Sequence, residues 1–370
     1  MPAQDQLDDL IAIVPPLLQA MEALGHVARH LDPPRFGELM AEVGAPDEAL
    51  AAALPRLESW PEELSPVSGA LTLAAAQVMQ SFERLRAAPE AEDGLTAIFR
   101  ALRGGWRSQE ALYPLAEALP PVGRFFLTPQ LRQDEALQAK LREAAARPDT
   151  GVIHSSAEPG ERGGFSMYVP EYYSDDRDWP LVMALHGGAG DGRGFLWSWL
   201  RDARALGAIV VAPTALGRTW ALNGSDVDSP NLARMLAMVT QRWRIDPARV
   251  LMTGMSDGGT FSYVSGLMAG SPFTHLAPVS ASFHPILIEF ADKERLQGLP
   301  IHICHGVRDW MFDVGVARLA EATLSAAGAA VTYLEIDDLA HTYPREINPT
   351  LLGWLDGASF ETPAGAGFSG

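Results

Sequence analysis

The sequence predicts an α/β fold with a mainly parallel central sheet and helices on both faces, preceded by an all-helical N-terminal domain. Two observations predict this class. Up to about residue 147, apolar residues recur at spacings of three and four, which is the helical period. From residue 151, short apolar runs alternate with helical stretches, as in proteins built around a parallel sheet. We therefore expect a helical domain over 1–147, a sheet domain over 148–357 and a flexible tail over 358–370.

The N-terminal domain is expected to consist of helices separated by glycine and proline breaks. Its segments are rich in Ala and Leu and show no alternation of Val or Ile, which argues against strands. The breaks include Gly104-Gly105 and Pro120-Pro121, which are typical ends of helices. Helical periodicity covers residues 7–31, 36–43, 46–60, 67–86, 95–102, 109–119 and 130–146.

Seven apolar runs in the second domain have the length and composition of buried strands. Helical stretches such as 231–244 and 314–327 lie between them, which favours parallel pairing. The final stretch is rich in Gly, Ala and Ser, which indicates a poorly ordered tail. The expected strands are 165–169, 181–185, 208–212, 250–254, 276–280, 301–304 and 331–336.

Composition restricts the classes of partner. The net charge of −18 is spread along the chain, which argues against nucleic acid and anionic membrane surfaces as partners. The single cysteine, Cys304, lies in an apolar run and can form no internal disulfide. Residues 1–9 carry no Lys or Arg, and Pro15-Pro16 interrupts the next apolar stretch, so no secretory signal is expected. No run approaches a membrane span in length, and a cytoplasmic protein is expected.

The most specific signal lies in residues 252–259. Gly254-x-Ser256-x-Gly258 follows the apolar run 250–252 directly and precedes a helix-compatible segment over 260–268. A serine between a strand and a helix lies on a sharp turn, and only small residues fit two positions away on either side. This pattern is typical of a nucleophile elbow, in which the serine hydroxyl projects at the end of a sheet.

A serine nucleophile needs a base, and the base needs an orienting carboxylate. Asp309 follows the strand-like run 301–304, and His341 follows the run 331–336. Loops at the carboxyl ends of parallel strands open on one edge of the sheet, so both can converge on Ser256. We assign Ser256 as nucleophile, Asp309 as orienting acid and His341 as general base. Asp313 is the competing acid, but it lies farther from the strand end.

Other histidines also follow the serine. His302 falls within a predicted strand and is expected to be a core residue. His305 lies at the strand end, where we expect it to support the loop of the acid. His341 is the only histidine after the predicted acid, and this favours it as the base.

Ester hydrolysis forms an oxyanion that needs preplaced donors. One donor should be the backbone N–H of Asp257, the residue after the nucleophile. The Gly-rich segment 186–192 directly follows the strand-like run 181–185, and we assign the second donor to Gly188, with Ala189 as the alternative. His186 is expected to anchor this loop. A phosphate loop is disfavoured, because the segment lacks both Gly-Lys-Ser/Thr and the G-x-G-x-x-G spacing.

These motifs resemble those of the α/β-hydrolase superfamily, and most closely those of bacterial serine esterases of the phospholipase/carboxylesterase and polyhydroxybutyrate-depolymerase or feruloyl-esterase-like groups. The likeness covers about residues 150–357. It implies an α/β-hydrolase fold, a Ser-Asp-His triad and no metal or organic cofactor. The segments that carry it are Leu185-His-Gly-Gly188, Pro213 with Gly217-Arg-Thr-Trp220, Asp246-Pro-Ala-Arg-Val250, Gly254-Met-Ser-Asp-Gly-Gly259, His305-Gly-x-x-Asp309 and His341.

Three residues are candidates for the substrate pocket. Trp220 lies in a segment of the resemblance, His284 follows a predicted strand, and Trp310 is next to the predicted acid. We expect no metal site. His26 and His30 lie four apart on one predicted helix, but the chain lacks a His-Glu-x-x-His pattern there.

The expected function is hydrolysis of a small-molecule carboxylic ester through an acyl-enzyme. A polyester depolymerase or a feruloyl or acetyl-xylan type esterase is the alternative enzyme; such enzymes act outside the cell, and the missing export signal counts against them. A non-catalytic binding module on a hydrolase scaffold is the alternative from another class. The N-terminal domain is expected either to cap the mouth of the site or to form an interface, for instance in a homodimer.

Overall fold

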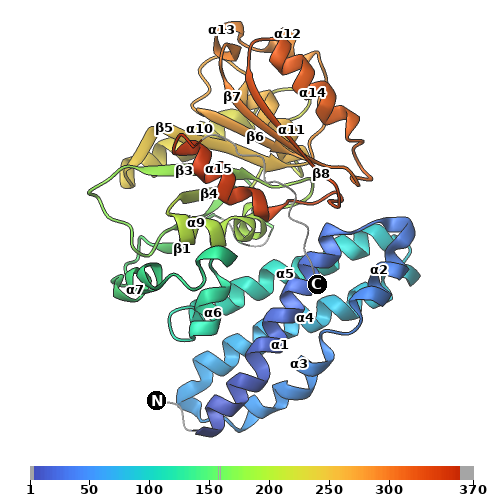
Figure 1. Cartoon of the computed structure of the whole chain (residues 1–370), viewed down its shortest axis with the longest axis vertical. Coiled ribbons are helices and arrows are strands. Elements are labelled where there is room, and N and C mark those ends of the chain that lie inside the picture. The colour runs from blue at the N-terminus through green and yellow to red at the C-terminus, as the bar shows by residue number, and fades with distance from the viewer. Residues whose placement is uncertain (1–3, 157, 159, 359–370) are drawn as a thin grey trace. The chain divides into compact units, whose positions relative to one another are not determined.

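The chain forms two compact units, Met1–Ala146 and Arg147–Gly370 (Figure 1). The computed structural model describes residues 4–156, 158 and 160–358. Each unit has its own set of buried apolar side chains. Of the predicted flexible tail over 358–370, all but the first residue lies outside the described residues.

The first unit is helical. Helix α1 buries a stripe that includes Ile13, Leu17 and Leu24, at the spacing that places residues on one helix face. The sequence predicts that helices continue through Pro55 and Pro114. Both residues lie instead near the start of short 3-10 segments, because proline removes a hydrogen-bond donor of the helix. The helices are α1 (Gln4–Arg29), α2 (Phe36–Val43), α3 (Glu48–Ala53), α4 (Ser65–Ala87), α5 (Gly94–Leu112), α6 (Pro120–Phe125) and α7 (Glu135–Glu143).

The prediction that Gly104-Gly105 breaks a helix is wrong. Helix α5 continues through both glycines and lies beside α4 (Figure 1). A Cβ atom on Gly104 would lie 1.9 Å from Ser81 Oγ and 2.6 Å from the carbonyl oxygen of Gln77. The Ser81 hydroxyl also lies 2.8 Å from the carbonyl oxygen of Ala101 on α5. The missing side chain at Gly104 therefore allows the two helices to approach closely.

Helix α1 departs from another expectation, that no run approaches the length of a membrane span. It is 26 residues long, and its apolar stretch continues through Pro15 and Pro16 inside the helix. By length and composition it is the one helix among the described residues that could cross a membrane. A buried core helix and a signal sequence meet the same criteria, and 39% of its most apolar window is buried within the structure.

The second unit is built on an eight-stranded sheet in the order β1-β2-β4-β3-β5-β6-β7-β8. The pairs β1–β2 and β2–β4 are antiparallel, and all the pairs from β4 to β8 are parallel. The predicted fold class, a mainly parallel sheet, is confirmed. The strands are β1 (Gly151–Ser155), β2 (Phe165–Val169), β3 (Trp179–Leu185), β4 (Ile209–Pro213), β5 (Ile245–Met255), β6 (His275–Val279), β7 (Pro300–Gly306) and β8 (Ala330–Ile336).

Strand β1 is the strand that the sequence analysis missed. It lies at the edge of the sheet and pairs on one side, with β2. None of its residues is fully buried, so its sequence lacks a long apolar run. Strand β3, by contrast, is buried along its whole length and has the continuous apolar sequence of a central strand.

Helices cover both faces of the sheet. The connection from β3 to β4 through α9 runs across the sheet in the opposite direction to the connections through α10, α11 and α14. Right-handed crossovers therefore place α9 on one face and the other three on the opposite face. Helix α15 lies beside α9 (Figure 1). The helices are α8 (Gly192–Phe195), α9 (Leu200–Leu206), α10 (Asp228–Arg242), α11 (Asp257–Gly266), α12 (Leu287–Phe290), α13 (Lys293–Leu296), α14 (Gly315–Ala326) and α15 (Asn348–Leu355).

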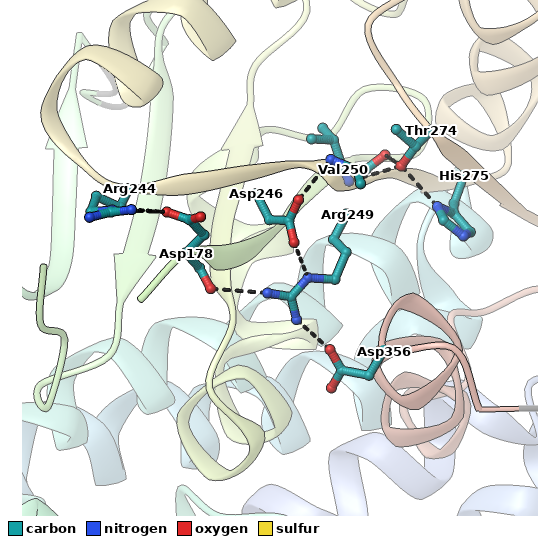
Figure 2. A network of polar contacts seen from close by, with 9 residues as sticks. Asp178, Arg244, Asp246, Arg249, Val250, Thr274, His275 and Asp356 are labelled. Carbon is teal, nitrogen blue, oxygen red and sulfur yellow. Dashed lines mark hydrogen bonds and ion pairs between the residues drawn. The ribbon is translucent and has the colours of Figure 1, made fainter. Parts of the chain in front are cut away.

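A polar network at the start of β5 ties the end of α15 to the sheet (Figure 2). The guanidinium of Arg249 donates to the carboxylate of Asp246 at 2.7 Å and to the carbonyl oxygen of Asp178 at 3.0 Å. It also pairs with the carboxylate of Asp356, the residue that follows α15. One side chain thus links three segments that are far apart in the sequence.

We predict that Arg249→Met destabilises the second unit by about 1–2 kcal/mol, because three acceptors lose a charged donor that is partly screened by water. Hydrogen exchange of peptides from α15 and β5 measures this unit separately from the helical one. Arg234→Met, on the exposed face of α10, is the control and should change stability by less than about 0.5 kcal/mol. Unchanged protection of α15 in Arg249→Met would contradict the role of the network.

The buried imidazole of His302 predicts a loss of stability in acid. Burial lowers the pKa of His302 to about 4, from 6.5 when unperturbed. The unfolded chain therefore binds a proton that the folded chain excludes, and the neutral side chain contributes stability that is present above pH 6.5 and lost as the pH falls towards 4. Lowering the pH from about 7 to about 5 should therefore reduce the free energy of unfolding by about 2 kcal/mol through this group. Hydrogen exchange of β7 peptides at the two pH values should show the loss in the wild type and a smaller loss in His302→Leu. Equal pH dependence in the two proteins would exclude His302 as the cause.

Candidate active site

Ser256 lies on the turn between β5 and α11 in a strained conformation. Its φ of 56° and ψ of −119° fall in a region that residues with side chains rarely adopt. A Cβ atom on Gly254 would lie 2.5 Å from the carbonyl carbon of Gly258. A Cβ atom on Gly258 would lie 2.5 Å from the carbonyl oxygen of Leu185, at the end of β3. The two glycines thus allow the turn to pack tightly. The Ser256 N–H donates to the carbonyl oxygen of Val279 at 2.9 Å.

Ser256, His341 and Asp309 form one hydrogen-bonded chain. His341 Nε2 lies 3.0 Å from Ser256 Oγ, and His341 Nδ1 lies 2.8 Å from Asp309 Oδ2. The three residues are 6%, 6% and 8% exposed, respectively. Because Nδ1 faces a carboxylate, it carries the proton, and this leaves Nε2 as the acceptor for the serine hydroxyl. The structure therefore brings together all three side chains of the predicted triad.

The carboxylate of Asp309 is held by its own loop. Its Oδ1 accepts the backbone N–H groups of Met311 and Phe312, each at 2.9 Å. Burial favours the neutral carboxyl, but the hydrogen bond from His341, together with the N–H of Phe312, outweighs it and holds the pKa of Asp309 below its ordinary value. Asp309 is thus an anion that faces His341.

Two neighbouring residues have other roles. His305 Nε2 lies 2.9 Å from the carbonyl oxygen of Phe312 and 3.4 Å from Asp309 Oδ2, so it braces the acid loop, as the sequence analysis expects. The competing acid, Asp313, is not part of the chain of contacts to His341. Its carboxylate accepts the N–H of Gly315 at 2.8 Å, at the start of α14.

The predicted oxyanion donors lie next to the elbow. A Cβ atom on Gly188 would lie 2.7 Å from Asp257 Oδ2, so the Gly-rich loop and the first turn of α11 are in close contact. Within the described part of the chain, neither the Gly188 N–H nor the Asp257 N–H has a hydrogen-bond acceptor. The alternative donor, the N–H of Ala189, is used differently: it donates to the carbonyl oxygen of Arg218 at 3.2 Å.

His186 holds the Gly-rich loop from inside. Its Nε2 accepts the N–H of Ala215 at 3.1 Å, so Nδ1 carries the proton and donates to the carbonyl oxygen of Gly187 at 2.6 Å. Burial lowers the pKa of His186 to about 4, which keeps the ring neutral in this role. At the far end of the loop, Arg162 Nη1 donates to the carbonyl oxygen of Gly190 at 2.9 Å.

Trp220 lies behind the loop rather than in an open pocket. Its indole N–H donates to the carbonyl oxygen of His186 at 2.8 Å, and its ring stacks on Phe261 at 5.4 Å. The side chain is 3% exposed and belongs to the hydrophobic core. Trp220 thus differs from the expectation that it lines the pocket, because its ring is buried in the core and its indole N–H supports the loop.

The other two predicted pocket residues lie in loops at the same sheet edge. Trp310 is half-buried, with its ring centroid 6.1 Å from that of His341. His284 is exposed, and its Nδ1 accepts the N–H of Ile286 at 3.1 Å. Phe312 was missed: its ring stands edge-on to His341 at 5.3 Å. A single aromatic residue in a loop carries no sequence signal for this position.

Two further supports were also missed. Asp228, which is 1% exposed, accepts the N–H groups of Leu216 and Ala221 and thereby closes the segment that carries Trp220. The hydroxyl of Thr219 in that segment donates to Asp257 Oδ2. Asp228 is separated from Leu216 and Ala221 by 12 and 7 positions, and no local sequence motif indicates such contacts.

The described residues contain no group of three or more His, Cys, Asp or Glu side chains that could hold a metal ion. The rings of His26 and His30 lie 4.3 Å apart in the helical unit, and His26 Nε2 lies 4.0 Å from Glu42.

Known proteins that resemble this chain include esterases. No family model matches it. A probable feruloyl esterase C from Aspergillus terreus (strain NIH 2624 / FGSC A1156) is 27% identical over 123 residues, which are 31% of this chain and 45% of the relative. The match thus spans less than half the length of that curated protein.

Solved structures to which this chain is similar include a ferulic acid esterase (15% identity, TM-score 0.46, 55% of this chain and 96% of the other). A truncated carbohydrate esterase from gut microbiota has 14% identity and a TM-score of 0.44, with 57% and 99% covered. A thermostable esterase has 20% identity and a TM-score of 0.40, with 56% and 60% covered.

The fold of the second unit is established by features of its own, independently of these structures. They are the parallel strands β3 to β8, the antiparallel strands at one edge, and the sharp turn at Ser256 between β5 and α11. The predicted fold is confirmed at this level: the second unit has the strand arrangement and the strand-serine-helix turn of an α/β-hydrolase fold.

Proposed function

We propose that this protein is a serine hydrolase of carboxylic esters. The observation that carries the proposal is the continuous chain of hydrogen bonds from Ser256 Oγ through His341 to Asp309, at 3.0 and 2.8 Å. A serine hydroxyl within reach of an oriented, buried imidazole is activated for attack on a carbonyl carbon. The esterase among the curated relatives supports ester bonds as the target.

In the proposed mechanism, Ser256 Oγ attacks the ester carbonyl and its proton passes to His341 Nε2. The imidazolium is stabilised by the carboxylate of Asp309, which holds the Nδ1 proton throughout. His341 then gives its proton to the departing alcohol, and an acyl group remains on Ser256. Water repeats the sequence, with His341 as its base, and releases the acid.

The negative charge of the tetrahedral intermediate needs donors next to Ser256. We assign this role to the backbone N–H groups of Asp257 and Gly188. The first lies at the start of α11, where the helix dipole adds positive potential. The second belongs to the loop that His186 and Arg162 hold in place. Both donors are fixed before the reaction, so no reorganisation is needed as the charge develops.

A feruloyl-type esterase is the second candidate. Two aromatic side chains, Trp310 and Phe312, lie beside His341, and the curated relative is named a probable feruloyl esterase. An aromatic acyl group would gain edge-to-face contacts with such rings. A preference for methyl ferulate over p-nitrophenyl esters of acetate to palmitate would favour this candidate over a general carboxylesterase.

We predict that Ser256→Ala loses nearly all ester hydrolysis, at least about 10⁴-fold in kcat, since it removes the nucleophile and leaves the fold intact. Hydrolysis of the p-nitrophenyl ester series and of methyl ferulate measures the loss. Circular dichroism of the variant controls for folding. If the folded variant keeps its turnover, Ser256 is not the nucleophile. If the wild type neither hydrolyses any ester nor reacts with a fluorophosphonate, the chain is a binding module.

The role of Asp309 predicts a large effect from a small change. Asp309→Asn should lower kcat by about 10³–10⁴-fold, because an amide offers a weaker partner for Nδ1–H and allows the other tautomer of His341. Asp313→Asn provides a matched control four residues away and should keep wild-type turnover. Equal losses in the two variants would point to a disturbed loop, and a loss confined to Asp313→Asn would reverse the assignment of the acid.

A further inference from the structure

The loop that carries His341 leads directly into α15, and a buried hydrogen bond closes it. Tyr343 lies two residues after His341, and its hydroxyl donates to Asn348 Oδ1 at 2.8 Å. Asn348 is the first residue of α15. Burial raises the pKa of the Tyr343 hydroxyl well above its ordinary value, so the group stays protonated and donates.

Asn348 extends this contact to a second helix. Its side-chain Nδ2 donates to the carbonyl oxygen of Ser198 and to Asp202 Oδ2, each at 2.9 Å. Asn348 is 0% exposed, and Tyr343 and Asp202 are also buried. Polar groups at this depth cost free energy unless they are paired, so loss of one partner leaves the others unsatisfied. Tyr343, Asn348 and Asp202 form what we call the α15 bridge.

The α15 bridge fixes one end of a helix that is also fixed at the other. At the C-terminal end of α15, Asp356 pairs with Arg249 (Figure 2). At the N-terminal end, the α15 bridge ties Asn348 to α9, and the two helices lie side by side (Figure 1). The segment 341–347 therefore leads into a helix that is held at both ends and cannot easily slide or rotate.

We propose that the α15 bridge positions His341 for proton transfer with Ser256. Asp309 orients the imidazole ring through Nδ1, but it does not fix the backbone that carries the ring. The bridge supplies that second constraint from the other side of His341. The inference rests on the proposed esterase function. A displacement of about 1 Å at a catalytic group can cost about 10²-fold in rate, so a small shift of the loop is enough to affect turnover.

Tyr343→Phe tests the proposal, because it removes one oxygen and keeps the ring against Phe195. We expect kcat to fall by about 10-fold with KM changed by less than about 2-fold, since the substrate contacts remain while proton transfer is impaired. The rate of labelling by a fluorophosphonate, which needs the same activated serine, should fall by the same factor.

Tyr173→Phe is the matched control. Tyr173 is also buried, and its hydroxyl donates to Asp175 at 2.6 Å and accepts the N–H of Arg244 at 2.9 Å. It lies near the start of β3 and β5, whereas Ser256 follows the opposite end of β5. This variant should lose thermal stability to a similar extent and keep the wild-type kcat and labelling rate.

Three outcomes separate the possibilities. Slower labelling and a lower kcat in Tyr343→Phe, with both unchanged in Tyr173→Phe, support the positioning role. Equal loss of stability with a wild-type kcat in both variants overturns it and leaves the bridge a purely structural element. A wild type that fails to react with the fluorophosphonate overturns the proposed function, and the positioning role with it. Asn348→Ala, which removes the centre of the bridge, should show a larger loss; if it does not fold, Tyr343→Phe decides alone.

Discussion

The close packing of the β5–α11 turn against the end of β3 is the constraint on which the site depends. Gly258 lies so near Leu185 and His186 that a single added carbon would fall 2.5 and 2.6 Å from their carbonyl oxygens. The strained backbone of Ser256 is maintained by this contact. Because the Gly-rich loop begins at the end of β3, the same packing sets the distance between the serine and the predicted oxyanion donors.

The loops at this edge are held by buried polar side chains that face inward, not by their own secondary structure. His186, Asp228, His305 and Asn348 each make polar contacts with at least two backbone or side-chain groups. Each is at most 2% exposed. Such groups specify one arrangement, because any other leaves a buried donor or acceptor unpaired. Function in loops thus depends on polar residues in the interior of the unit.

The sequence was sufficient for the fold class and for the residues that meet at the elbow, because both have local signatures. Continuous apolar runs marked the central strands, and Gly254-x-Ser256-x-Gly258 marked the turn. Asp309 and His341 followed from chain order and from the rule that parallel strands end on one edge. Strand β1 and the path of α5 through Gly104 were beyond this reasoning. An edge strand need not be apolar, and a glycine that allows helix contact has the same sequence as one that ends a helix.

Residues that position the site were the hardest to predict, since each acts across a long separation in the chain. Asn348 meets Asp202 from 146 positions away, and Trp220 reaches His186 from 34. Trp220 illustrates the difficulty. Its place in a motif led us to expect a contact with substrate, but its indole N–H donates to the carbonyl oxygen of His186, behind the loop. In this unit, the residues of the proposed triad are few and marked by motif. The precision of their arrangement comes from buried partners that only the three-dimensional structure reveals.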